Sequence, residues 1–107
     1  MPILQVNLKL NVSTGEYHDL CRSLAQTFAE VPGLQWKVWL LNEQEKEAGG
    51  IYLFSSERAV QDYLSGPIVA QLQGHPAFRE ISVKRFDVMD EVTAITRGPV
   101  VKAAAAD

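Results

Sequence analysis

Two apolar segments decide the fold: LQWKVWLL at residues 34–41 and GGIYLF at residues 49–54. Side chains alternate across a β-strand, so the first segment presents two faces. By this alternation they are Trp36, Val38 and Leu40 on one side, and Lys37, Trp39 and Leu41 on the other. Both faces are largely apolar, and such a strand needs cover on both sides. The polar residues 42–47 lie between the segments, which predicts an antiparallel hairpin.

The residues before this hairpin predict a strand followed by a helix. Residues 3–10 alternate between apolar and polar side chains, which is the period of a half-buried strand. Ser13 and Glu16 have the spacing of a capping box. Behind them, apolar residues recur every three or four positions, and the helix is expected to end before Pro32-Gly33.

The residues after the hairpin predict two short helices and a fourth strand. Ser55 or Ser56 can cap a helix over residues 57–64, and Pro67 can begin another that runs to residue 72. Residues 81–88 are expected to form the last strand. Asp90 can then cap one helical turn over residues 91–95.

The predicted order is β-α-β-β-α-β, which is the ferredoxin-like α+β arrangement. It places a four-stranded antiparallel sheet under helices that cover one face. We expect residues 1–95 to form this single domain, and residues 96–107 to form a tail that is flexible or crosses to a partner subunit. The alanine run 103–106 is expected to fray.

One face of such a sheet has no cover, and in this chain that face carries a tryptophan. Exposed apolar surface costs about 25 cal/mol per Å². The simplest remedy is a homodimer in which two sheets pack through their open faces.

Composition limits the function classes. The 107 residues hold ten Lys and Arg against thirteen Asp and Glu, for a net charge of −3, so nothing indicates nucleic-acid binding. No apolar run is long enough to cross a membrane, and no signal peptide is recognisable. Cys21 is the single cysteine, expected in the core of the first helix. We therefore expect a cytoplasmic protein without an internal disulfide.

The hairpin also carries a family resemblance. Residues 33–39 and the run 47–54, with Tyr63-Leu64 and residues 84–88, resemble the YdhR family of small bacterial proteins, which are similar to the antibiotic-biosynthesis monooxygenases. The resemblance extends to about residue 95. It implies a dimeric α+β barrel and kinship with cofactor-independent enzymes that oxidise polycyclic phenols to quinones with O2. In such enzymes the substrate supplies the electrons, and the protein binds the ring and shields the intermediates from water.

The aromatic residues of the strands are candidates for a substrate-binding wall. Trp36 and Trp39 lie three apart on one strand and point to opposite faces, so only one can line a given pocket. Each is either a packing residue or a wall that stacks on a planar ring. Tyr52 in the hairpin and Tyr63 near the end of the second helix either pack on the sheet or meet the substrate. The hydroxyl of Tyr52 could also orient or protonate an oxygen atom.

Two polar residues complete the candidates. His75 lies in a Gly-His-Pro loop; it is an exposed loop residue or the group that takes a proton from a phenol. Asn7, on the polar face of the first strand, could bind an oxygen atom. Haem-degrading proteins of this fold use an Asn, a Trp and a His, but here the tryptophans lie on the second strand and not the third, which argues against haem. His18 is far from His75 in sequence, and we expect no metal and no cofactor.

The leading hypothesis is a cofactor-independent monooxygenase acting on an aromatic or polycyclic phenol. His75 and Tyr52 are its expected catalytic residues, and Trp36, Trp39, Tyr63 and Asn7 its expected substrate contacts. The alternative is a non-catalytic dimer that binds a small ligand or serves in a stress response.

Overall fold

The computed structural model describes residues 1–100. Its elements follow the predicted order. They are β1 (Pro2–Leu10), α1 (Thr14–Ala29), β2 (Leu34–Asn42), β3 (Glu47–Phe54), α2 (Glu57–Leu64), α3 (Pro67–Gly74), β4 (Phe78–Asp87) and α4 (Asp90–Ile95). The strands form one antiparallel sheet in the order β2-β3-β1-β4. The ferredoxin-like α+β prediction is therefore confirmed.

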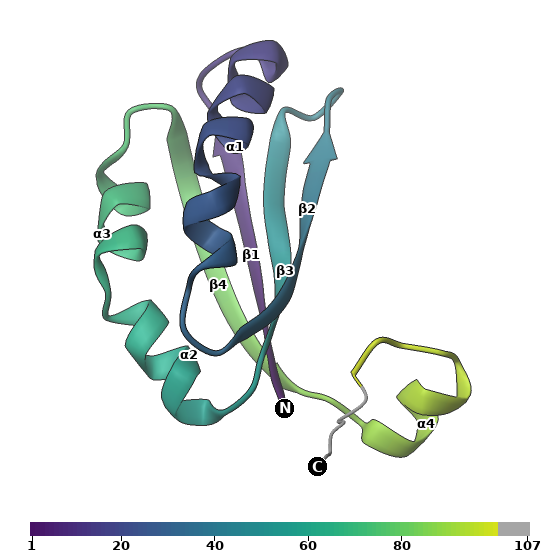
Figure 1. Ribbon diagram of the computed structural model, residues 1–107. Coiled ribbons are helices and arrows are strands. Elements are labelled where there is room, and N and C mark those ends of the chain that lie inside the picture. Colours follow the sequence, from purple (N-terminus) through teal and green to yellow (C-terminus); the bar gives the residue numbers. More distant parts are fainter. Residues whose placement is uncertain (101–107) are drawn as a thin grey trace.

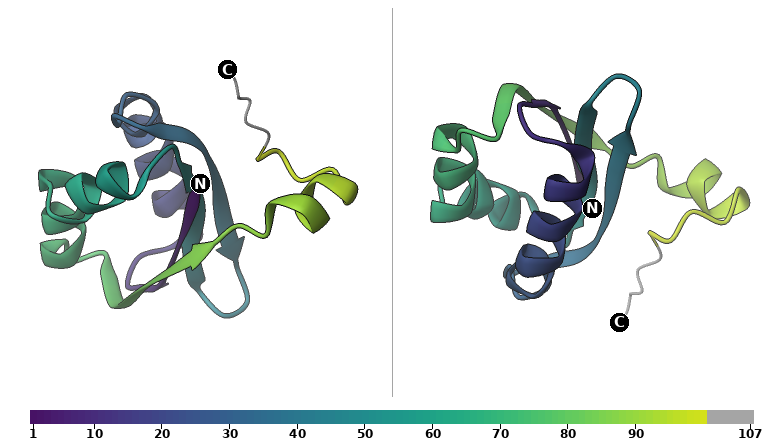
Figure 2. Two further views of the ribbon diagram at one scale, coloured as in Figure 1. Left: turned by 90° about the horizontal axis from the view of Figure 1, so that it is seen from below. Right: turned by 90° about the horizontal axis from the view of Figure 1, so that it is seen from above.

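Helices α1, α2 and α3 lie on one face of the sheet, and α4 projects from the body beyond the end of β4 (Figures 1 and 2). The alternation of β1 turns Leu4, Val6, Leu8 and Leu10 toward the three helices, and all four are buried. Tyr52 and Phe54 of β3 lie on the same side. The core therefore lies between the helices and this face of the sheet.

Local sequence signals set the helix starts. Ser13 caps α1, with its hydroxyl accepting the N–H of Glu16 at 3.1 Å. Ser56, one of the two expected serines, caps α2 in the same way. Pro67 opens α3 at a position where a missing N–H costs no hydrogen bond. At α4 the expectation was wrong in detail, because Met89 is the cap residue and Asp90 lies in the first turn.

Two strands begin earlier than expected. β3 starts at Glu47, because Glu47 and Ala48 already pair with both neighbouring strands. β4 starts at Phe78 and not at residue 81, and its pairing with β1 shifts between Asn7 and Lys9. Glu80 has a positive φ of 54° at this irregularity, so one extra residue breaks the period-two pattern.

The open face of the sheet carries Trp36, Val38 and Leu40. This is one of the two faces of β2 between which the sequence did not decide. Val38 is 49% exposed and Phe86 of β4 is 47% exposed. After α4 the chain turns back, and the indole N–H of Trp36 donates to the Pro99 carbonyl at 2.8 Å. Of the tail predicted at 96–107, residues 101–107 lie outside the described part of the chain, as does the alanine run.

Candidate functional site

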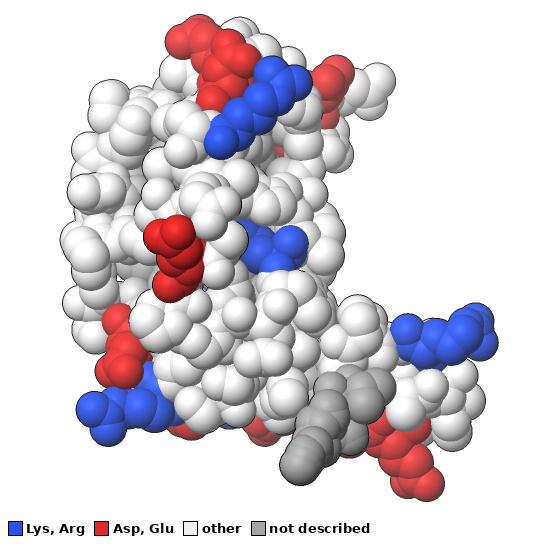
Figure 3. Space-filling model, viewed as in Figure 1, with Lys and Arg blue, Asp and Glu red and all other residues white. Residues whose placement is uncertain are grey.

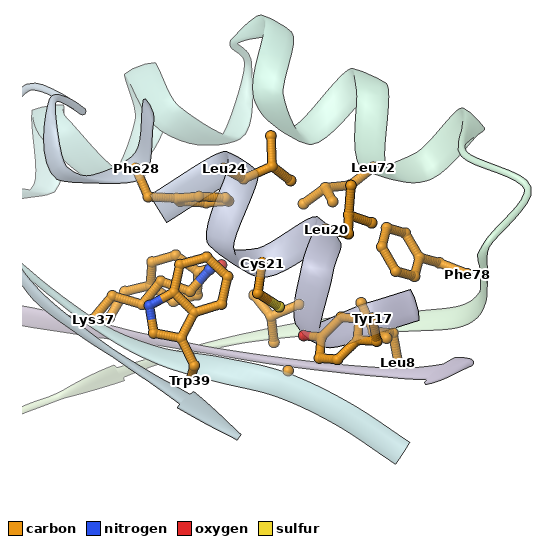
Figure 4. Close-up of a pocket in the computed structure, with 13 residues that line it drawn as sticks. Leu8, Tyr17, Leu20, Cys21, Leu24, Phe28, Lys37, Trp39, Leu72 and Phe78 are labelled. Carbon is orange, nitrogen blue, oxygen red and sulfur yellow. The ribbon is translucent and has the colours of Figure 1, made fainter. Parts of the chain in front are cut away.

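A narrow cleft lies between α1 and the helix-covered face of the sheet. Its walls are aliphatic and aromatic side chains of α1, α3 and all four strands, among them Phe28, Trp39, Tyr52 and Phe78. Figure 4 shows these side chains pointing into the space between the helix and the strands. The free volume is about 30 Å³, which is room for one or two water molecules.

Lys37 enters this cleft from β2. Strand alternation places it on the same face as Trp39, and the register sets it directly opposite Tyr52 of β3. Its ammonium nitrogen lies 3.4 Å from the ring centroid of Trp39, 3.5 Å from that of Phe28 and 4.7 Å from that of Tyr52. Three aromatic rings therefore surround one amine. Figure 4 shows two of them, those of Phe28 and Trp39, beside Lys37.

The position of Lys37 changes its acid–base chemistry. Burial removes water from the ammonium and lowers the pKa of Lys37 to about 7. The electron-rich ring faces favour the cation, so they act against desolvation. No carboxylate lines the cleft to hold the charge. At neutral pH Lys37 can therefore exchange a proton with a bound molecule.

Gly50 makes room for the lysine stem. A Cβ at Gly50 would lie 2.9 Å from Cε of Lys37 and 3.1 Å from the Tyr52 ring. A larger residue at position 50 would displace the Lys37 side chain from its place between the three rings. At Gly49, the other residue of the glycine pair, the backbone of β1 approaches so closely that a Cβ would overlap the Val6 carbonyl oxygen.

Helix α1 adds two weakly acidic groups to the cleft wall. The Tyr17 hydroxyl lies beside the Cys21 thiol, and both residues line the cleft. Burial raises the pKa of Tyr17 and of Cys21, so both groups stay protonated at neutral pH. The polar atoms that meet in the cleft are therefore neutral donors, apart from the Lys37 amine.

Tyr52 and Tyr63 are brought together. The Tyr63 hydroxyl donates to the Tyr52 hydroxyl over 3.4 Å, and the ring centroids are 5.5 Å apart. Burial raises the pKa of both hydroxyls, which keeps them neutral. Tyr52 lines the cleft, whereas Tyr63 lines a separate hollow of about 300 Å³ between the end of α1 and the junction of α2 with α3.

A second hollow lies on the outer side of Lys37. This outer groove, of about 240 Å³, runs between the C-terminal half of α1 and the edge strand β2. Lys37, Phe28 and Trp39 line both the cleft and the outer groove, and Gln35 and Trp36 line the groove alone. Figure 3 shows basic atoms recessed in the middle of a largely uncharged face.

The remaining candidates lie elsewhere. Asn7 belongs to the open face, in a shallow hollow with Leu40. Trp36 lines the outer groove and binds the tail. His75 is exposed in the loop after α3, where its Nδ1 accepts the N–H of Ala77 at 3.0 Å. His75 stacks on Phe78, a cleft residue, at 5.1 Å, but does not itself line the cleft.

Trp39 and Tyr52 are thus the predicted residues that meet in the cleft, and Lys37 is the residue that sequence reasoning missed. The signal was present, because alternation places one lysine between the apolar residues of a strand face that must be covered. A covered lysine without an acidic partner is uncommon and marks candidate functional sites.

Within residues 1–100, no three metal-binding side chains lie close enough to hold an ion. No helix among the described residues is long and apolar enough to span a membrane. The haem-type set of Asn, Trp and His does not converge, because Asn7 and Trp39 lie on opposite faces of the sheet and His75 lies in an exposed loop.

Solved structures share this fold at low sequence identity. NE2512 from Nitrosomonas europaea, of unknown function, matches with a TM-score of 0.70 and 17% identity over 82% of this chain and 88% of its own. SnoaB from Streptomyces nogalater, a cofactor-independent oxygenase, matches with a TM-score of 0.64 and 17% identity, over 81% and 92%. The haem degrader MhuD from Mycobacterium tuberculosis, with two haems in its active site, matches at 0.63 and 20%, over 81% and 95%.

No curated protein matches the sequence. A family model does, over residues 3–99, which is nearly the whole chain. This match confirms the resemblance carried by the hairpin residues. The chain therefore belongs to the family described as "Putative mono-oxygenase ydhR".

Proposed function

We propose that this protein is a cofactor-independent oxygenase that converts an aromatic or polycyclic phenol to a quinone with O2. The observation that carries the proposal is the Lys37 amine, held among three aromatic rings in a cleft whose other polar groups are neutral. An aromatic wall can stack on a planar ring, and an amine with a pKa near neutrality can accept the phenol proton.

The substrate enters from the outer groove, because the cleft holds only one or two waters. A planar ring that stacks on Trp39 takes the place of the amine, which moves on its flexible stem to the edge of the ring. There it meets the phenol oxygen and holds the phenolate as an ammonium. The neutral hydroxyl of Tyr52 is then available to donate a hydrogen bond, since it already accepts one from Tyr63.

The reaction balances without another reductant. The electron-rich phenolate passes electrons to O2; one oxygen atom forms a new bond to ring carbon, and the other leaves as water with the two displaced hydrogens. The substrate is oxidised by four electrons to the quinone, and O2 is reduced. The protein supplies ring binding, the proton acceptor and exclusion of bulk water.

The test is turnover of a hydroxyanthracene by the metal-free and flavin-free protein, in air and under argon. We expect quinone formation only in air, with a rise in kcat centred near pH 7 as Lys37 loses its proton. Lys37→Met should lower kcat roughly 100-fold, in the range for a lost general base. Lys46→Met, in the exposed turn between β2 and β3, is the matched control and should retain full activity.

His75 competes with Lys37 for the role of proton acceptor. If His75→Gln removes the pH-dependent rise and Lys37→Met keeps it, the exposed histidine is the base. Equal rates in air and under argon would disprove the oxygenase.

A ligand-binding role without turnover is the second candidate. The outer groove favours it, because its volume of about 240 Å³ can hold a ligand beside the Lys37 amine without any reaction. Binding of the hydroxyanthracene with no quinone after long incubation in air would support this role.

We also propose that two copies pair through the open face of the sheet. Val38 and Phe86 are about half exposed there, and Met89 and Ile95 of the projecting α4 segment are 73% and 70% exposed. Apolar surface of this kind gains about 25 cal/mol per Å² when it is buried. A second copy of the same face supplies a complementary cover with two-fold symmetry.

A cytoplasmic location is proposed with this assembly. The single cysteine, Cys21, is a free thiol packed against the core. A core thiol of this kind fits a reducing compartment. Fractionation of cells that express the protein tests the location.

A further inference from the structure

The Lys37 amine lies where two hollows of different character meet. On its inner side is the narrow cleft, with room for water alone. On its outer side is the groove between α1 and β2, of about 240 Å³, which has room for an aromatic compound. A molecule in the outer groove can therefore reach the amine without entering the core.

We propose that Lys37 is a covalent capture site for small aromatic aldehydes, which it binds from the outer groove as an imine. This site goes beyond the proposed oxygenase and does not depend on it, since a carbonyl compound and no O2 is involved.

The surroundings of the amine favour this reaction. The titratable groups that face it are Cys21 and Tyr17 from α1 and Tyr52 from β3, all of which burial keeps neutral at pH 7. No acidic side chain lines either hollow. An amine without a carboxylate partner in an apolar site is neutral for a larger fraction of the time than an exposed lysine, and the neutral amine is the nucleophile.

The groove also selects the class of aldehyde. Trp39 and Phe28 flank the amine, and Trp36 extends the aromatic wall toward the open side. An aromatic ring can stack there while its carbonyl carbon meets the nitrogen. Gln35 at the groove can hydrogen-bond a ring substituent. A short aliphatic aldehyde gains no such stacking.

The step balances in atoms and charge. The nitrogen lone pair forms a bond to the carbonyl carbon, the C=O π bond breaks onto oxygen, and a proton moves from nitrogen to oxygen. The resulting hydroxyl leaves with a second proton as water, and the C=N bond forms. No oxidant or reductant takes part, and addition of water reverses the capture.

The experiment traps the imine in the full-length protein. Benzaldehyde and sodium cyanoborohydride are added at about pH 7, where an ordinary lysine, with a pKa near 10.4, is almost fully protonated. The reductant converts the imine to a stable secondary amine. Intact mass and peptide mapping then report how many sites react and which ones.

We expect a group added at Lys37 roughly tenfold or more faster than at any other lysine, beside some labelling of the α-amino group, whose ordinary pKa is about 7.7–8.0. Its labelling rate should rise with a midpoint near 7. Benzaldehyde should label faster than propanal at equal concentration, because of the aromatic wall. Lys46→Arg, in the exposed turn between β2 and β3, is the matched control, and it should leave the labelling of Lys37 unchanged.

Two results would overturn the proposal. One is labelling spread over the exposed lysines or confined to the α-amino group, with Lys37 unmodified. The other is an unchanged amount of product in Lys37→Arg, whose fold is first checked by circular dichroism. The trapping experiment does not depend on oxygenase turnover. A protein that fails as an oxygenase can still show Lys37 labelling, and an active oxygenase can fail to show it.

Discussion

At the residue scale, Lys37 is the point at which stability and function conflict. Its amine is removed from water and lies among three aromatic rings with no carboxylate beside it, and the pKa of Lys37 falls to about 7. An unfolded chain exposes the same amine with an ordinary pKa of about 10.4. Between these values the unfolded state binds more protons than the folded state, so the free energy of unfolding should rise with pH.

This difference gives a stability prediction. The wild type should gain roughly 1–2 kcal/mol between about pH 6 and pH 8, below the range in which the cysteine and the tyrosines of the unfolded chain ionise. Lys37→Met removes the buried charge and fills the same space, so the variant should be more stable at pH 6 to 7 and should lose this pH dependence. Urea unfolding at several pH values measures both. Identical pH dependence in the two proteins would mean that the amine is solvated.

The residue scale also shows what sequence can predict. The alternation of side chains along β2 correctly predicted that Trp36 and Trp39 lie on opposite faces of the sheet, because this prediction needs only strand geometry. The same pattern placed Lys37 beside Trp39, but it cannot show that Phe28 of α1 closes over the amine, because that contact depends on how the helix packs on the sheet. His75 and Asn7 were chosen for their chemistry, and chemistry alone does not bring distant residues together.

At the element scale, the site depends on the close approach of β1, β2 and β3. A Cβ on Gly49 would overlap the Val6 carbonyl oxygen of β1. The strands can pair at this point only because the residue is glycine. The sheet floor under the cleft is therefore fixed by backbone contact and not by side-chain packing.

Gly49→Ala should destabilise the protein by roughly 2 kcal/mol, the range for overpacking in a filled interior. Gly15→Ala on α1 is the control, because its Cβ would meet only the Ser13 hydroxyl oxygen at 3.9 Å. That variant should stay within about 0.5 kcal/mol of the wild type. Thermal melts followed by circular dichroism compare the two, and equal melting temperatures would show that the sheet can shift to admit a methyl group.

Element order and helix caps were predictable because they rest on local signals such as Ser13, Ser56 and Pro67. The start of β4 was not, because the bulge at Glu80 breaks the alternation without a glycine or proline to mark it. The positive φ of Glu80 is stabilised by the strand pairing on either side of it, and no residue type in the surrounding sequence indicates this conformation.

At the scale of the whole molecule, the uncovered sheet face is the main unsatisfied feature. A β-α-β-β-α-β order leaves one face open whatever the side chains are, and this much followed from topology. Which tryptophan the open face carries could not be decided from alternation, because both faces of β2 are apolar. The structure places Trp36 there, with Val38 and Leu40.

Val38→Glu should convert the proposed dimer to a monomer, because a charge at the centre of an apolar contact cannot be buried without a partner. Val83→Glu is the matched control. Val83 is 39% exposed against 49% for Val38, but it pairs with Val6 and so belongs to the helix-covered face. Light scattering after size-exclusion chromatography gives both masses. A wild type that elutes as a monomer would refute pairing through the open face.

As the proposed oxygenase, the protein transfers oxygen from O2 to a phenol with its own side chains alone. The most direct measurement is mass spectrometry of the quinone formed from a hydroxyanthracene under isotopically heavy O2 in ordinary water, with the metal-free protein. We expect one heavy oxygen in each quinone molecule and almost no product with Lys37→Met. A quinone whose new oxygen comes from water, or an equal yield with no protein present, would contradict it.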